Sequence, residues 1–187
     1  SIYSDISIRI IFFSSSNKEA ASAFASSVLP TPVGPKNKNE PIGLFGSFNP
    51  IHNGHIQIAR SVLERAICNE VWFVVSPQNP FKAGVDMLPE KVRYSLVEKV
   101  VESEVGLKAC NVELDMPKPS YTIDTLNVLE KLYPQHTFSI LMGGDNIAKF
   151  DKWKSHEELA ARFQLIAYPR PGAEIPSFIP EKTIIIN

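Results

Sequence analysis

The stretch Gly43-Leu-Phe-Gly-Ser-Phe-Asn-Pro-Ile-His-Asn-Gly-His55 decides the fold of this chain. It overlaps the apolar run Ile42 to Phe45, and it is followed by apolar residues at helical spacing between Ile56 and Ala66. This pattern predicts a strand, a glycine-bearing turn and a helix, in that order. The two histidines, His52 and His55, are three residues apart and therefore share one face at the start of the predicted helix.

The start of a helix is a favourable place for an anion, because its first backbone N–H groups have no intrahelical partner and the macrodipole is positive there. Two imidazoles add further donors, and Gly54 between them removes a side chain that would block close approach. The stretch does not match the dinucleotide, P-loop or zinc-protease patterns. The residues alone favour phosphate binding, and ordinary packing of the two histidines stays the alternative.

Gly46-Ser-Phe-Asn-Pro-Ile-His-Asn-Gly-His55 resembles the signature of the nucleotidylyltransferase superfamily, Gly-Ser/Thr-Phe-x-Pro-x-His-x-Gly-His. Within it, the chain from about Pro41 onward most resembles the bacterial nicotinate-nucleotide adenylyltransferase family. The resemblance implies transfer of an adenylyl group from ATP to nicotinate mononucleotide in NAD biosynthesis, with Mg²⁺ bridging the phosphates and no metal site of the protein's own. Asn49 stands where many family members have Asp, and we expect it to organise the turn by local hydrogen bonds.

The resemblance also implies roles for particular residues. His52 and His55 would be catalytic, contacting the ATP phosphates and stabilising the transition state. Further ATP contacts are implied for Gly46, Ser47, Phe48, Gly143 and Asp145. Contacts to the mononucleotide are implied for Lys82, Tyr121, Thr122, Trp153 and Arg170.

Several of these residues also have ordinary structural interpretations. Lys82 could be a solvated loop lysine, Thr122 a helix cap, and Trp153 a packing residue. Arg93 matches a family arginine, and we expect it only to tie the structure together.

The composition is that of an ordinary globular protein, with 44% hydrophobic and 21% charged residues. A net charge of −1 indicates neither a nucleic-acid surface nor a basic membrane patch, and no apolar stretch is long enough to span a bilayer. The two cysteines, Cys68 and Cys110, form no metal-type pair, which predicts reduced thiols in a cytoplasmic protein. The sequence predicts no oligomeric state.

From Pro41 the chain alternates between strand-like and helix-like segments. Further strands are predicted over 71–75, 107–114, 137–142 and 163–168, with a sixth beginning at 183. Helices are predicted from Pro89, from Tyr121 or Thr122 to Leu132, and through Ala161 after a cap at Ser155, where Ser155 and Glu158 would form a capping box. The helix from Pro89 would bury one stripe made of Val92, Leu96, Val97, Val100 and Val101. The alternation predicts a single α/β domain with a Rossmann-like, doubly wound parallel sheet and a site beyond the carboxyl ends of the strands.

The two ends of the chain differ from this pattern. Residues 1–40 contain nine serines between Ser1 and Ser27 and predict a poorly ordered extension before a nucleotidylyltransferase domain over 41–187. The family's Ser-Ser-Thr-x-x-Arg type segment, which grips ATP phosphates, has no match in the sequence, so a C-terminally truncated domain is expected. The alternatives are an adenylyltransferase for nicotinamide mononucleotide or phosphopantetheine, or a nucleotide-binding fragment without turnover. His52 counts against phosphopantetheine, because that family usually has Thr there.

Overall fold

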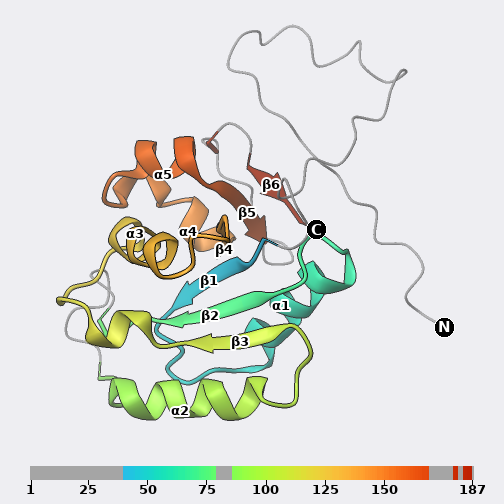
Figure 1. Ribbon diagram of the computed structural model, residues 1–187, viewed down its shortest axis with the longest axis vertical. Helices are drawn as coiled ribbons and strands as arrows, with labels where there is room; N and C mark the ends of the chain where they lie inside the picture. Colours follow the sequence, from blue (N-terminus) through green and yellow to red (C-terminus); the bar gives the residue numbers. More distant parts are fainter. Residues whose placement is uncertain (1–39, 79–85, 169–178, 181–182, 187) are drawn as a thin grey trace, which may run out of the picture.

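In the computed structural model, which describes residues 40–78, 86–168, 179–180 and 183–186, six parallel strands form one sheet (Figure 1). The strands are β1 (Ile42–Gly46), β2 (Val71–Val75), β3 (Leu107–Cys110), β4 (Ser139–Gly143), β5 (Gln164–Tyr168) and β6 (Ile184–Ile185). Apart from Glu40, the predicted extension over residues 1–40 lies outside the described residues, as do Lys82 and Arg170.

The strand order is β3-β2-β1-β4-β5-β6, which is the Rossmann order. β1 lies at the centre and pairs with both β2 and β4, so Ile42 is opposite Val71 on one side and Ser139 on the other. The direction in which strands are added reverses between β1 and β4, and ligands of such sheets bind beyond the carboxyl ends of the strands at this point. The predicted fold class is confirmed.

Helices cover both faces of the sheet (Figure 1). α1 (Asn53–Glu64) and α2 (Glu90–Val101) pack on one face, while α3 (Thr122–Leu132) and α5 (His156–Arg162) pack on the other. Three shorter elements lie near the carboxyl ends of the strands: η2 (Val112–Asp115), α4 (Gly144–Ile147) and η3 (Phe150–Lys152). Each face of the sheet therefore has its own buried core.

The prediction of one strand over 107–114 was wrong beyond Cys110. There the chain leaves the sheet at Asn111, which has φ −101° and ψ 8°, and continues as the 3-10 turn η2. This turn buries the carboxylate of Glu113, which is only 2% exposed. The apolar pattern could not distinguish this turn from a strand, because its end is set by the contacts of Glu113 with residues further along the chain.

The apolar stripe predicted for α2 was wrong in three of its five members. The buried residues are Arg93, Val97 and Val101, spaced four apart, while Val92, Leu96 and Val100 are exposed. The reason is that the Arg93 side chain points inward and fixes which face of the helix is buried.

The capping box predicted at Ser155 was also wrong. Ser155 precedes α5 with φ 53° and ψ 40°, and its side chain makes no capping hydrogen bond. The left-handed backbone replaces the extended conformation that a capping serine requires. The helix itself is present, over His156–Arg162.

Candidate active site

The two signature histidines lie side by side at the start of α1. His52 occupies the N-cap position, and its ring stacks on that of His55 with centroids 3.8 Å apart and an interplanar angle of 29°. The backbone N–H of His52 donates to Nδ1 of His55 at 3.3 Å. Because Nδ1 accepts, a neutral His55 ring carries its hydrogen on Nε2.

Gly54 lets the two rings lie this close. A Cβ atom at this position would be 3.1 Å from Cε1 of His52, which is tighter than ordinary packing allows. The absence of a side chain at Gly54 therefore leaves room for the His52 ring, and the close approach of a phosphate stays a prediction.

Ser47 and Phe48 direct their side chains into the protein and are only 5% and 2% exposed. The Phe48 ring packs on Phe73 at 5.4 Å and meets the His55 ring edge-on at 5.1 Å. Phe48 has φ 44°, in the left-handed region that is unusual for a residue other than glycine. The burial of these side chains leaves mainly backbone groups at positions 47 and 48 to meet a ligand.

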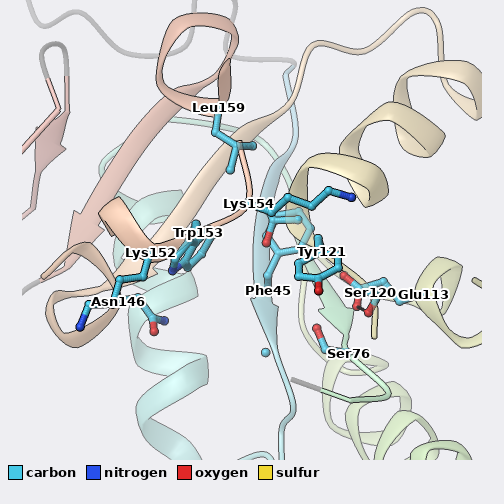
Figure 2. Close-up of a pocket in the computed structure, with 12 residues that line it drawn as sticks. Phe45, Ser76, Glu113, Ser120, Tyr121, Asn146, Lys152, Trp153, Lys154 and Leu159 are labelled. Carbon is cyan, nitrogen blue, oxygen red and sulfur yellow. Dashed lines mark hydrogen bonds between the residues drawn. The ribbon is translucent and has the colours of Figure 1, made fainter. Parts of the chain in front are cut away.

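A pocket of about 90 Å³ opens beside this turn (Figure 2). Figure 2 shows Trp153 and Tyr121 on opposite sides of the pocket, with Phe45 from the central strand between them. The lining residues come from the end of β1 and from segments that follow β2, β3 and β4: Phe45, Gly46, Ser76, Glu113, Ser120, Tyr121, Thr122, Asn146, Lys152, Trp153, Lys154 and Leu159. The pocket is therefore a composite site at the carboxyl edge of the sheet, as predicted from the alternation of strands and helices.

Glu113 holds the α3 side of the pocket in place. The hydroxyl of Ser120 donates to its carboxylate at 2.5 Å, and the hydroxyl of Thr125 donates at 2.9 Å. In the part of the chain that the structure describes, no cation forms an ion pair with this carboxylate. Two hydroxyl donors satisfy the buried charge and fix the backbone where α3 begins.

Lysines add positive charge around the pocket. Nζ of Lys154 lies 4.7 Å above the ring of Tyr121 and 2.8 Å from Oδ2 of Asp124. Figure 2 shows this side chain extending across toward α3, with Lys152 on the other side of Trp153. The sequence analysis missed Glu113 and both lysines. A lone acidic residue within an apolar run and two lysines flanking a tryptophan were the available signals.

Both parts of the site lie in a region that is similar to one family of known proteins. The cytidylyltransferase-like family matches residues 44–186. The nicotinate-nucleotide adenylyltransferase of Cytophaga hutchinsonii is 45% identical over 133 residues, which cover 71% of this chain and 69% of the relative. The protein of the same name from Bacteroides thetaiotaomicron is 39% identical over 147 residues, which cover 78% and 73%. The chain belongs to the nicotinate-nucleotide adenylyltransferase family.

Solved structures show the same fold. The nicotinic acid mononucleotide adenylyltransferase of Plasmodium falciparum, complexed with NaAD, has a TM-score of 0.67 at 21% identity and covers 80% of this chain and 75% of that chain. A nicotinate-nucleotide adenylyltransferase structure from Vibrio parahaemolyticus has a TM-score of 0.58 at 23% identity and covers 70% and 74%. The chain therefore shares the fold of these solved structures.

The residues expected from this family fall into three groups. Gly46, Tyr121, Thr122 and Trp153 line the pocket together, and His52 and His55 lie at the start of α1. Gly143 ends β4 with open space where a Cβ atom would be, and Asp145 is exposed on α4, but neither lines this pocket. Lys82 and Arg170 lie outside the described residues.

Two further properties hold for the part of the chain that the structure describes. Its His, Cys, Asp and Glu side chains form no cluster of three or more that could hold a metal ion. In the same ranges, each helix is too short or too polar to cross a bilayer.

Proposed function

We propose that this chain transfers the adenylyl group of ATP to the phosphate of nicotinate mononucleotide. An oxygen of the mononucleotide phosphate attacks the α-phosphorus of ATP and a new P–O bond forms. The bond between the α-phosphorus and the bridging oxygen breaks, so that pyrophosphate leaves and nicotinate adenine dinucleotide remains. The attacking oxygen is already anionic near neutral pH, so the protein's task is positioning and stabilisation of charge.

One observation carries this proposal: the end of β1 belongs to both halves of the site. Phe45 and Gly46 line the pocket, while the residues that follow Gly46 form the turn with the two histidines. A ligand in the pocket and a phosphate at the start of α1 would therefore be neighbours. This is the arrangement that a reaction between two nucleotides requires.

At the turn, the donors suit the charge that develops during transfer. The Nε2–H of His55, the ring of His52 and the first backbone N–H groups of α1 would face the phosphoryl oxygens. Backbone N–H groups at Gly46, Ser47 and Phe48 would help to hold the nucleotide. Mg²⁺ would enter with ATP, bound to phosphate oxygens of that substrate.

In the pocket, the aromatic residues suit the pyridine ring of the acceptor. The Trp153 indole would stack on the electron-poor pyridinium. Tyr121 and Thr122, where α3 begins, would meet the ring carboxylate with backbone and hydroxyl groups. We further propose that Lys82 and Arg170 reach the acceptor, with Arg170 near its phosphate, and that Gly143 and Asp145 contact ATP.

We place the reaction in the cytoplasm, where ATP is available and buried thiols such as Cys68 and Cys110 stay reduced.

The test is pyrophosphate release from MgATP with nicotinate mononucleotide, nicotinamide mononucleotide or phosphopantetheine offered separately. Release with the first and little with the others would support the proposal. Release with nicotinamide mononucleotide alone would keep the reaction and change the acceptor. A folded chain that binds ATP and releases no pyrophosphate with any of the three would overturn the proposal.

A further inference from the structure

Arg93 is the largest fully buried side chain described in this protein, at 1% exposure. Its guanidinium donates four hydrogen bonds, and each acceptor is a backbone carbonyl. Nε donates to Leu88 at 2.9 Å, Nη2 donates to Pro77 at 2.9 Å, and Nη1 donates to Ser76 at 2.8 Å and to Ser47. Four of the five N–H groups of the guanidinium are thus used to hold the main chain.

The charge of Arg93 has no ionic partner among the described residues. Burial lowers the pKa of the guanidinium, and the carboxylate of Glu90 opposes this effect from a distance, while Glu90 itself pairs with Lys118 at 2.6 Å. A buried cation that is held only by carbonyl dipoles is costly to keep. The four carbonyls therefore need a planar group with several fixed donors, which arginine has and lysine lacks.

Three of the four carbonyls that accept from Arg93, those of Ser47, Ser76 and Pro77, lie just after the parallel ladder of β1 and β2 stops. The last ladder bond runs from the N–H of Ser76 to the carbonyl of Gly46 at 2.8 Å. The next carbonyls, those of Ser47 and Ser76, both receive Nη1 of Arg93. The guanidinium thereby continues the pairing of the two strands by one residue, up to the first residue of the histidine turn.

The same part of the chain contacts the turn a second time. The backbone N–H of Leu88 donates to Oδ1 of Asn49 at 3.0 Å, and Nδ2 of Asn49 donates to the carbonyl of Asp86 at 3.4 Å. The expectation that Asn49 would organise the turn by local hydrogen bonds was wrong, because its partners are more than 35 residues away in the sequence. The turn is therefore held from outside by the segment that leads into α2.

We propose that Arg93 is a positioning residue for the nucleotide-binding turn over residues 46–55. Fixing the carbonyl of Ser47 toward Arg93 directs the N–H of the same peptide plane, that of Phe48, to the opposite side. It also fixes where the Phe48 ring enters the core, and this ring supports His55, which stacks on His52. Arg93 touches no substrate in this scheme and acts through the turn. The proposal rests on the ATP site proposed above.

The experiment compares Arg93→Lys and Arg93→Met with Val97→Ala in the full chain. Val97 is fully buried one helical turn further along α2, so Val97→Ala removes core packing on the same helix without touching the turn. For each variant we would measure thermal stability, the affinity for MgATP by calorimetry, the affinity for nicotinate mononucleotide by calorimetry, and kcat from pyrophosphate release.

Arg93→Lys is expected to weaken MgATP binding about tenfold and to lower kcat roughly 10- to 100-fold, because reacting groups displaced by about 1 Å lose rate on this scale. Binding of nicotinate mononucleotide should stay within about twofold of the unmodified chain. Arg93→Met should show the same separation with larger losses. Val97→Ala should lower the melting temperature and leave both affinities and kcat unchanged.

Two outcomes would overturn the inference. One is that Arg93→Lys loses stability and leaves MgATP affinity and kcat intact. The other is that Arg93→Lys lowers the affinities for MgATP and for nicotinate mononucleotide by the same factor. A general loss of stability would have that effect. If the unmodified chain binds MgATP in an Arg93-dependent manner and still transfers nothing, the proposed reaction fails while the positioning role stands, so the two failures are distinguishable.

Discussion

The histidine turn over residues 46–55 and the pocket beside it, where acceptor binding is proposed, are built in opposite ways. The turn is one continuous stretch of sequence, and a buried cation holds it through backbone carbonyls. The pocket is assembled from the end of β1 and from segments that follow β2, β3 and β4, and a buried carboxylate holds its α3 side through two hydroxyls. In each half the sign of the buried ion fits the groups that it orients, since a cation binds carbonyl oxygens and a carboxylate binds hydroxyl hydrogens.

Both buried ions come from one short part of the chain. Arg93 lies in the crossover between β2 and β3, and Glu113 follows β3 directly. Arg93 reaches back to the end of β1, while Glu113 reaches forward to the start of α3. The turn and the pocket thus differ in construction, but the same part of the chain holds both in place. Variants in each of them can test whether they function independently.

The largest effect is expected from His55→Ala. Because His55 is proposed to donate to charge that develops at the phosphoryl group, its loss should lower kcat by about 10²-fold or more with little change in acceptor KM. Steady-state pyrophosphate release measures both constants. The matched control is His136→Ala, since His136 lies before β4 in an aromatic cluster with Trp72. Unchanged turnover in the His55 variant would show that His55 does not stabilise the transition state.

The next effect is expected from Trp153→Ala, which should raise the KM for nicotinate mononucleotide about tenfold and change kcat less, because base–aromatic stacking contributes about 1–3 kcal/mol. Trp72→Phe is the control, because Trp72 packs on Tyr133 and Phe138 away from the pocket. If both variants leave the acceptor KM unaltered, Trp153 is only a packing residue, and the proposal that this pocket binds the acceptor is wrong.

A smaller effect is expected from Glu113→Gln, which tests whether Glu113 affects only the pocket, whereas Arg93 is proposed to affect only the turn. A side-chain amide offers one acceptor oxygen, so one of the two hydroxyls loses its contact with residue 113. The Thr125 hydroxyl also donates to the carbonyl of Tyr121 at 3.1 Å, so the loss is expected at Ser120, at a cost of about 1–2 kcal/mol. The melting temperature should fall by several degrees, and the acceptor KM should rise a few-fold while MgATP affinity stays constant. Glu102→Gln, at an exposed site after α2, is the control. A loss confined to MgATP would contradict the assignment of Glu113 to the pocket.

The smallest effect on catalysis is expected at Cys68, before β2 and away from both halves. Burial raises the pKa of its thiol from 9.0 to about 12. Because the folded-state pKa is the higher one, this thiol's contribution to stability is fully present below pH 9. It is lost between pH 9 and about pH 12, by up to about 1.4 kcal/mol per pH unit. Denaturant unfolding of the chain and of Cys68→Ala across this range isolates the difference. Equal pH dependence in the two proteins would show that the thiol is not buried as described.

The sequence predicted the parts of the molecule that depend on local periodicity. The run Val71–Val75 and the helix over Thr122–Leu132 have the predicted bounds, because a continuous β-branched run and a 3.6-residue period each allow few other structures. The placement of His52 and His55 followed from the turn for the same reason. Their role in catalysis stays a prediction that the His55 variant tests.

The features that the sequence did not predict depend on distant contacts. The inward direction of Arg93 is set by carbonyls at the ends of β1 and β2, and the end of β3 is set by the hydroxyls of Ser120 and Thr125, which Glu113 contacts further along the chain. The position of Lys154 over Tyr121 is set by Asp124 on another helix. The Lys154–Asp124 and Arg93–Ser47 pairs are 30 and 46 residues apart in the sequence. Glu113 and Ser120 are only 7 residues apart, but apolar periodicity does not indicate a polar contact of this kind.

The position of Gly46 at the boundary of the two halves has a consequence for the product. In the proposed reaction each substrate would occupy one half, whereas nicotinate adenine dinucleotide would occupy both at once and act as a bivalent ligand. When one end dissociates, the other end keeps it at a high local concentration, so the product should leave more slowly than either substrate. We therefore expect a burst of dinucleotide in the first turnover, followed by a steady rate that is set by product release.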